Sequence, residues 1–274
     1  PYLSQKELEE NVRLSCQVKV RNDLKIVIPE ALFLIKEFRV KADHMKDFNA
    51  DIREIQFGII EPEEGIKFKP GQYVQLQIPK YELSKEPEYR AYSISSSAEE
   101  HDRIELIIGK VYGGTVSTYV HDYLKEGEEL LINGPYGEFY LRDSDRDILM
   151  LATGTGLAPI KSILHQIETD KIQRKATLFF GARTRKDLLY HEKLKEFETT
   201  IPNFRYVPTL SRPTDEDQWD GETGRVTNLI EKNIPKNAQA DVDICGSPAM
   251  VDSCAALLAE KGISEDRIFY DKFG

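Results

Sequence analysis

Cysteine, tryptophan and long apolar runs are scarce in this chain. Its 274 residues include three cysteines, three methionines and one tryptophan. Three cysteines cannot form the disulfide framework of a small secreted domain, so we expect a reducing compartment. No run approaches the roughly 18 apolar residues of a membrane span, and the start Pro1-Tyr2-Leu3-Ser4 does not resemble a signal peptide. These absences predict a cytoplasmic protein with no membrane span in this chain.

The chain also lacks an excess of positive charge. It has 37 lysines and arginines against 47 aspartates and glutamates, which gives a net charge of −10. Nucleic acids and anionic membranes attract cationic surfaces, so we expect neither as a partner. With 40% hydrophobic and 31% charged residues the composition is that of a globular protein, and the length favours two domains over one.

Two successive patterns predict a β + α/β fold. Short strand-like runs separated by turn residues predict an antiparallel β-barrel over 37–143. Apolar strands that alternate with helical stretches predict a parallel sheet, covered by helices on both faces, over 144–274. The strands are expected at 51–60, 73–78, 91–95, 103–111, 129–133 and 138–141, and then at 148–152, 177–180, 205–210, 241–245 and 267–271.

Residues 1–36 are too few to form a core of useful size. One interpretation is an N-terminal extension that packs on the main body. The other is the end of a plant-type [2Fe–2S] domain, because Arg13-Leu14-Ser15-Cys16-Gln17 resembles the segment around the last cysteine ligand of such domains. The other three cluster cysteines are absent, so Cys16 is a metal ligand only in a longer parent protein.

The stretch Arg90-Ala91-Tyr92-Ser93 offers a cation, an aromatic face and a hydroxyl within four residues. In an extended strand Arg90 and Tyr92 share one face, and Ser93 points to the other. An ordinary half-buried strand with an exposed arginine is the plainer interpretation of these residues alone. A ligand with an anionic part, a ring system and hydrogen-bonding ring atoms would also suit this set.

A glycine-rich segment, Gly113-Gly114-Thr115-Val116-Ser117, precedes a helix expected at 117–124. Two glycines let the backbone approach a ligand, and Thr115 or Ser117 is expected to cap the helix. The first N–H groups of a helix bind phosphate readily. An ordinary turn with a helix cap is the alternative, but with Arg90 the barrel would contain two anion-binding elements.

Three loops at predicted strand ends suggest a nucleotide site. Gly154-Thr155-Gly156-Leu157-Ala158-Pro159 has two of the three glycines of a dinucleotide-binding loop. Gly181-Ala182-Arg183-Thr184-Arg185 and Cys245-Gly246-Ser247-Pro248-Ala249-Met250 follow two further strands. Turn glycines, solvated arginines and a core cysteine would explain each loop separately. The carboxyl ends of parallel strands meet at one edge, so three such loops favour a shared site.

Taken together, these motifs resemble the ferredoxin–NADP⁺ reductase superfamily over about residues 38–274. The resemblance implies that the barrel binds FAD and that the parallel-sheet domain binds the nicotinamide nucleotide. The implied FAD ligands are Arg90, Ala91, Tyr92, Ser93, Ile108, Lys110, Gly113, Gly114, Thr115 and Ser117. The implied nucleotide ligands are Gly154, Thr155, Gly156, Ala158, Pro159, Gly181, Arg183, Arg185, Asp187, Cys245, Gly246, Ser247, Pro248, Met250 and Phe273.

The resemblance also implies an NADH-dependent, FAD-containing oxidoreductase. Hydride would pass from the nicotinamide to flavin N5, with Ser93, Cys245 and Phe273 at the reacting rings. Ser93 would lie near N5, Cys245 would set shape and polarity without acting as a nucleophile, and Phe273 would cover one flavin face. Electrons would then pass singly to an iron–sulfur centre missing here, and onward to an acceptor protein or complex.

Within the superfamily, Leu14–Val18 and Tyr270–Gly274 are most similar to the F subunits of sodium-translocating NADH:quinone oxidoreductases. Reductase components of multicomponent oxygenases come next. The first resemblance implies a parent protein at the cytoplasmic face of the inner membrane. Arg183 and Arg185 would suit NADPH, whereas their context, with Asp187 nearby, favours NADH. Alternatives are an NADPH-dependent ferredoxin or free-flavin reductase, and a non-catalytic flavin-binding regulator of a partner complex.

Overall fold

The computed structural model describes Glu9 and residues 18–23, 25–26 and 35–273. Cys16, the predicted cluster ligand of a longer protein, lies outside the described residues. The chain divides into a unit of Pro1–Phe33 and a unit of Leu34–Gly274. Within the described ranges, no group of three histidine, cysteine or carboxylate side chains is placed to hold a metal ion.

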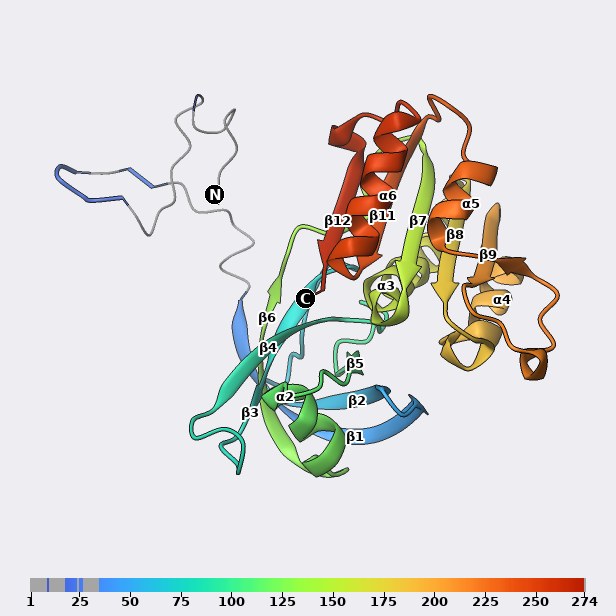
Figure 1. The fold of residues 1–274 in the computed structure, drawn as a ribbon. Helices are drawn as coiled ribbons and strands as arrows, with labels where there is room; N and C mark the ends of the chain where they lie inside the picture. The colour runs from blue at the N-terminus through green and yellow to red at the C-terminus, as the bar shows by residue number, and fades with distance from the viewer. Residues whose placement is uncertain (1–8, 10–17, 24, 27–34, 274) are drawn as a thin grey trace. The chain divides into compact units, whose positions relative to one another are not determined.

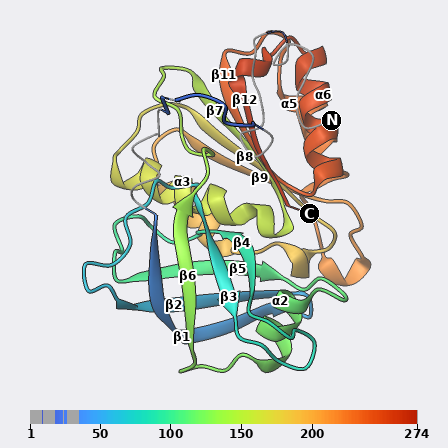
Figure 2. The same ribbon diagram turned by 90° about the vertical axis from the view of Figure 1, so that its left-hand side faces the viewer.

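The first half of the second unit is the predicted antiparallel barrel. Its strands are β1 (Lys36–Asn49), β2 (Ile52–Glu61), β3 (Tyr73–Ile78), β4 (Glu88–Ser93), β5 (Arg103–Gly109) and β6 (Glu129–Tyr136). They pair in the order β4-β3-β6-β1-β2-β5, and the two edge strands meet at a bridge between Ile94 and Leu106. Figure 2 shows β3 and β6 crossing β2 and β5 steeply, as strands do when a sheet curls on itself.

The barrel core follows from the alternation of side chains along each strand. In β3 every second residue, Val74, Leu76 and Ile78, is fully buried. The predicted strand at 138–141 is wrong, because no strand forms there and Phe139 instead joins the core of the parallel-sheet domain. The long strand β1 was not predicted, because most of its residues are polar and many of them are exposed.

The second half is the predicted parallel sheet. Its strands are β7 (Asp147–Thr153), β8 (Ala176–Ala182), β9 (Phe204–Leu210), β10 (Glu222–Thr223), β11 (Ala240–Gly246) and β12 (Ile268–Lys272). All pairs are parallel, in the order β10-β9-β8-β7-β11-β12. The chain runs outward from β7 in one direction and later from β11 in the other. Ligands of such sheets bind where this order reverses, outside the carboxyl ends of the strands.

Helices cover both faces of this sheet, as predicted. They are α3 (Leu157–Thr169), α4 (His191–Thr200), α5 (Val226–Asn233) and α6 (Pro248–Glu260). One core cluster contains residues of α3 and α4, the other contains residues of α5 and α6, and Figure 1 shows the two layers. The first cluster also includes Ile107 and Phe139 of the barrel, so the two domains share part of one core. No helix in the described part of the chain has the length and hydropathy to cross a membrane.

Two aspartates are buried in the first half of β11. Asp241 accepts hydrogen bonds from Arg146 at 2.7 Å and from Arg174 at 3.0 Å. Asp243 is also buried, and its Oδ1 atom has no hydrogen-bond partner among the described residues. Burial raises the pKa of Asp243 to about 7, against the opposing effect of Arg142. This carboxyl group therefore holds its proton in the folded state at mildly acidic pH.

Replacing Asp243 by Asn should change how stability depends on pH. Between the unfolded pKa of 3.8 and the folded pKa of about 7, only the folded state binds the proton. Each pH unit in this window therefore removes up to about 1.4 kcal/mol of stability, and Asp243→Asn lacks this loss. Relative to the parent, the variant should gain on the order of 2 kcal/mol between about pH 5 and pH 7 in urea unfolding. A difference that does not vary with pH would contradict this assignment.

Candidate functional site

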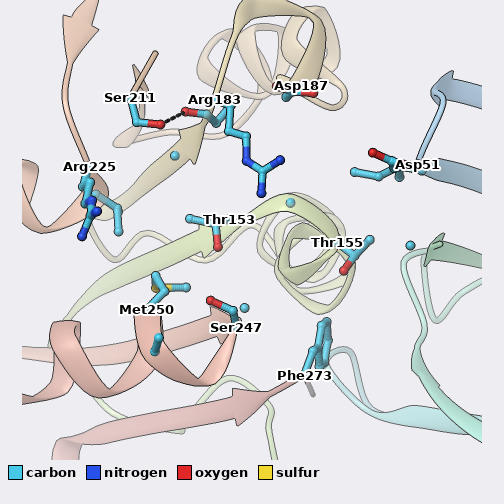
Figure 3. Close-up of a pocket in the computed structure, with 18 of the residues that line it drawn as sticks. Asp51, Thr153, Thr155, Arg183, Asp187, Ser211, Arg225, Ser247, Met250 and Phe273 are labelled. Atoms are coloured by element: carbon cyan, nitrogen blue, oxygen red, sulfur yellow. Dashed lines mark hydrogen bonds between the residues drawn. The ribbon is translucent and has the colours of Figure 1, made fainter. Parts of the chain in front are cut away.

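A cleft of about 960 Å³ opens where the carboxyl ends of β7, β8 and β11 face the end of β5. It is built from strand-end loops of the parallel sheet and from the Gly109–Lys110 end of the barrel strand (Figure 3). Many residues predicted to bind the nucleotide line it. They are Gly154, Thr155, Gly181, Arg183, Asp187, Gly246, Ser247, Met250 and Phe273.

The β7 loop and the end of β11 touch through their backbones. The loop forms a single 3₁₀ turn, η4 (Gly154–Gly156), before α3 begins. A Cβ on Gly156 would lie 2.2 Å from the carbonyl oxygen of Cys245, so only glycine permits this approach. Gly156 does not line the cleft itself, and its function is to let the two loops meet. Gly154 is different, since its φ is +54° and a Cβ there would meet no atom within 4 Å.

The C-terminal segment is tied to the same point. Phe273 donates its backbone N–H to the carbonyl oxygen of Gly246 over 3.0 Å, which continues the pairing of β12 with β11. The Phe273 ring then stands in the cleft below Thr155 (Figure 3). The structure therefore brings the predicted terminal aromatic to the nucleotide loop.

The far end of the cleft carries cations and hydroxyls. Arg183, Ser211 and Arg225 line it, and the Arg183 guanidinium points into the cleft in Figure 3. Asp187 lies nearby, but its Oδ2 accepts bonds from Thr184 and its Oδ1 accepts one from Asn49 at 3.1 Å. That carboxylate is therefore already used to hold the turn and the barrel loop. Arg185 is not part of the lining.

Arg185 has a structural contact instead of a place in the cleft. Its backbone N–H donates to Asp217 Oδ1 over 3.1 Å, and its guanidinium donates to the Asp217 carbonyl oxygen over 3.1 Å.

The other predicted nucleotide residues lie below the surface of the cleft or at a helix start. Ala158, Pro159 and Cys245 are buried beneath the loops. Pro248 occupies the first turn of α6, where its missing N–H costs nothing.

Ser93 is a buried residue of the barrel whose hydroxyl could bond a ligand. The residue is buried at 3% exposure, and its hydroxyl makes no hydrogen bond of good geometry among the described residues, although it lies close enough to Asp271 to lower the pKa of that carboxyl group. A buried hydroxyl without a partner is costly, so a ligand that offers one would be favoured there. Tyr92, its neighbour, packs half-buried on the barrel core, and burial raises its pKa to about 12.

Asp271 lies beside Cys245 but does not line the cleft. It is the register partner of Cys245, and its pKa is raised by burial, against the nearby Ser93 hydroxyl and the Lys272 N–H. The Cys245 thiol is fully buried, and burial together with Asp271 holds its pKa well above the ordinary value. A neutral buried thiol is a poor nucleophile, which agrees with the shape-and-polarity function predicted for Cys245.

The remaining predicted FAD residues do not line this cleft, with one exception. Arg90 is exposed on β4 and pairs with Glu88 at 3.4 Å. Ile108 is part of the barrel core, whereas Lys110 lines the cleft and pairs with Asp122 at 2.6 Å. Arg90 therefore lies at the surface, where it can meet a phosphate only from outside the barrel.

The glycine segment before the barrel helix differs from the prediction in one respect. The helix α2 (Thr115–Thr118) begins earlier than expected, continues as a π turn, η3 (Tyr119–Tyr123), and has no side-chain cap. Thr115 Oγ1 instead donates to Glu88 over 2.6 Å, and Ser117 Oγ accepts from the Val111 N–H over 3.0 Å. Capping by Thr115 or Ser117 was therefore wrong. Both hydroxyls instead brace the turn in which Gly113 adopts a φ of +78°.

Several lining residues were missed because they come from distant segments. They are Asn49, Asp51, Ile52, Tyr112, Thr153, Ser211, Gly224, Arg225, Val226, Thr227 and Ser253. Ser211 follows β9, a predicted strand, so the strand-end rule applied to that loop would have found it. Gly224–Thr227 follow β10, a strand of two residues that was not predicted. The contribution of the β1–β2 turn and of Tyr112 depends on how the barrel meets the sheet, and no local pattern encodes it.

Two glycines of the β7 loop provide a matched test of this geometry. Gly156→Ala must push the loop away from the β11 backbone, and we expect a loss of stability at or above the upper end of about 1–3 kcal/mol. Gly154→Ala has free space and costs only the left-handed backbone, about 1–2 kcal/mol. Urea unfolding measures both, and Gly156→Ala should also lose nucleotide affinity. Equal losses of stability for the two variants would contradict the close approach.

Comparison with known proteins agrees with this two-part site. The "Oxidoreductase FAD-binding domain" family matches residues 39–140, and the "Oxidoreductase NAD-binding domain" family matches residues 150–256. Among solved structures, Amycolatopsis cytochrome P450 reductase GcoB has a TM-score of 0.78 at 28% identity, covering 87% of this chain and 70% of that one. A ferredoxin NADP⁺ reductase from Neisseria gonorrhoeae with bound FAD and NADP has a TM-score of 0.71 at 24% identity, covering 87% and 98%, which shows a shared fold.

Whole-chain relatives are more specific. The F subunit of the Na⁺-translocating NADH-quinone reductase of Neisseria meningitidis is 33% identical over an alignment of 313 positions, covering 100% of this chain and 77% of the relative. The corresponding protein of Methylococcus capsulatus is 30% identical, again with 100% and 77% coverage. The chain therefore belongs to the family of the Na⁺-translocating NADH-quinone reductase F subunits, within the FAD- and NAD-binding oxidoreductases of ferredoxin–NADP⁺ reductase type.

Proposed function

We propose that this chain takes a hydride from NADH onto FAD and passes the electrons singly to an acceptor. The observation that carries the proposal is the convergence of three elements on one cleft. These are the β7 loop, the end of β11 with Phe273 attached, and the β5 end of the barrel. When bound, FAD accepts two electrons as a hydride and releases them one at a time.

The barrel residues fit a flavin on two counts. Ser93 supplies a buried hydroxyl, with Asp271 beside it, that can bond a polar atom of a flat ring system. Gly113 leaves open space around a backbone at φ +78°, which allows a phosphate to approach N–H groups. Arg90, exposed beside the Glu88–Thr115 contact, would supply the charge for that phosphate.

The nucleotide would lie along the carboxyl edge of the parallel sheet. Its pyrophosphate would meet the backbone of Gly154–Gly156 at the start of α3, where helix N–H groups favour anions. Its nicotinamide would reach the Cys245–Gly246 corner by taking the place of the Phe273 ring. Direct hydride transfer needs no general base, so the residues here bind, orient and exclude water.

The acceptor is the least constrained part of the proposal. The relatives' names give NADH as the donor and quinone as the acceptor of the Na⁺-translocating reductase. We propose that this chain has an equivalent place next to an iron–sulfur centre, to which Cys16 would contribute in a longer parent protein, in a quinone-reducing complex or an oxygenase. A parent at the cytoplasmic face of the inner membrane would fit the first of these.

NADPH is a second candidate donor, favoured by the cations at the far end of the cleft. No ion pair of Arg183 or Arg225 is found in the described part of the chain, and Ser211 lies beside them. Two guanidinium groups and a hydroxyl suit a 2′-phosphate, whereas the Asp187 carboxylate, which would favour a ribose diol, is already hydrogen-bonded.

Anaerobic titration of the FAD-loaded protein with NADH, and separately with NADPH, tests the proposal. We expect NADH to bleach the oxidised-flavin band near ~450 nm stoichiometrically, because the cleft holds donor and acceptor rings together. Stronger bleaching by NADPH would favour NADPH as the donor. FAD retention without bleaching by either nucleotide would favour a non-catalytic regulator, and loss of flavin on dialysis would favour a free-flavin reductase.

Phe273→Ala should tighten nucleotide binding, because the native ring competes with the nicotinamide for its place. An aromatic stack is worth about 0.5–1.5 kcal/mol, so the Kd of NAD⁺ should fall by up to about tenfold. The flavin absorbance spectrum should shift as well. A variant with the parent's flavin spectrum and the parent's nucleotide affinity would show that Phe273 merely packs.

A further inference from the structure

A buried polar cluster joins the barrel to the parallel-sheet domain away from the cleft. The barrel contributes Glu54 from β2, Glu105 from β5, and Ser95 just beyond β4. The parallel-sheet domain contributes Lys161 from α3 and Tyr190, the residue before α4. Glu54, Ser95, Glu105 and Lys161 are each no more than 8% exposed. We call these five side chains the interdomain cluster.

Glu105 is the centre of the interdomain cluster. Its Oε1 atom accepts hydrogen bonds from Lys161 Nζ at 2.5 Å, Ser95 Oγ at 2.6 Å and Tyr190 OH at 2.8 Å. Tyr190 OH also contacts Glu54, and Lys161 Nζ lies 4.4 Å from the centre of the Tyr190 ring. Burial alone would raise the pKa of Glu105, but Lys161 and these hydrogen bonds outweigh it and lower the pKa. Glu105 is thus held as a carboxylate.

Such a cluster is sensitive to the loss of one member. Buried charges are stable only while their partners remain in place, because water cannot replace the missing contact without entering the interface. Without Lys161, the Glu54 and Glu105 carboxyl groups would face one phenol with no cation beside them in the described contacts. The domains would then separate locally to admit water.

The interdomain cluster is attached to the segments that form the reaction site. Lys161 lies six residues after Thr155 on the helix that follows the nucleotide loop, about 9 Å along its axis. Glu105 lies on β5, whose end supplies Gly109 and Lys110 to the cleft. Ser95 is two residues after Ser93, the proposed flavin contact. A shift at the interdomain cluster therefore moves nucleotide loop and flavin strand relative to each other.

A second contact supports the same interface. Ser162, the residue after Lys161, donates its hydroxyl to the carbonyl oxygen of Ser96 over 2.7 Å, and both residues are buried. Ser95 N–H in turn donates to the Glu105 carbonyl oxygen over 2.8 Å, at the bridge that closes the barrel. The interface thus continues into the backbone at the point where the barrel sheet closes.

We propose that Lys161, Glu105 and Tyr190 are positioning residues that hold the nucleotide loop in register with the flavin strand. This proposal rests on the proposed function for its catalytic consequence, although the interface itself does not. Hydride transfer depends on reacting atoms about 3–3.5 Å apart, and a displacement of about 1 Å can cost on the order of a hundredfold in rate. Side chains far from the reacting rings would then control the rate without touching either ring.

The test is Lys161→Met in the full, FAD-loaded chain, with Lys195→Met as its control. Lys195 is an exposed lysine on α4, paired with Glu192 at 3.5 Å, and its loss should change nothing. For Lys161→Met we expect flavin reduction at saturating nucleotide to slow by about tenfold or more, while nucleotide Kd changes by less than about threefold. Stopped-flow kinetics of flavin reduction measure the reduction rate and the nucleotide Kd separately. An unchanged reduction rate would overturn the positioning function.

Tyr190→Phe is a second test variant, which keeps the proposal testable if Lys161→Met fails to fold. It keeps the ring beneath Lys161 and removes only the hydroxyl that bridges the two glutamates. As for Lys161→Met, we expect slower flavin reduction while the nucleotide affinity stays close to that of the parent. A variant that reduces its flavin at the parental rate would count against the proposal in the same way.

Hydrogen exchange gives a readout that needs no nucleotide. In both variants the amides of Ser95–Glu105 and of early α3 should exchange at least about tenfold faster, while β6, which carries no member of the interdomain cluster, keeps its protection. Unchanged exchange at these amides would overturn the proposal whatever the donor is. If the parent protein itself is reduced by neither NADH nor NADPH, the proposed function fails, and exchange alone then decides whether the interdomain cluster holds the interface.

Discussion

The backbone contact between Gly156 and Cys245 is the constraint on which the rest of the site depends. The Cβ atom of any side chain at position 156 would lie 2.2 Å from the carbonyl oxygen of Cys245, which is too close for two atoms that are not bonded. With glycine there, the loops after β7 and β11 meet at the point where the strand order reverses. This contact fixes the start of α3, and the pairing of β11 with β12 then brings Phe273 to the same corner.

The barrel reaches this corner through a shared core and a polar interface. Ile107 and Phe139 enter the core of the other domain, while Lys161 and Tyr190 bond to Glu105 of the barrel. Apolar contact is non-directional and tolerates small slides between surfaces, whereas hydrogen bonds to one carboxylate oxygen require defined positions. The combination gives an interface that is both stable and specific in register.

The sequence predicted the parts of the molecule that local patterns encode. Strand β3 has the predicted bounds, because period-two alternation is a local signal. The nucleotide loops were predictable for the same reason. The tertiary features were not. Arg185 bonds Asp217, Thr115 bonds Glu88 instead of capping its helix, and Asp271 lies beside Cys245 through the register of two strands.

The central claim is that one face of a nicotinamide ring is held against a flavin in this cleft. Anaerobic stopped-flow reduction with NADH that carries deuterium at C4, on one face or on the other, tests it most directly. A fixed ring exposes only one of the two hydrogens, so one labelled form should reduce the flavin more slowly and the other at the unlabelled rate. Equal slowing by both forms, or by neither, would contradict the account.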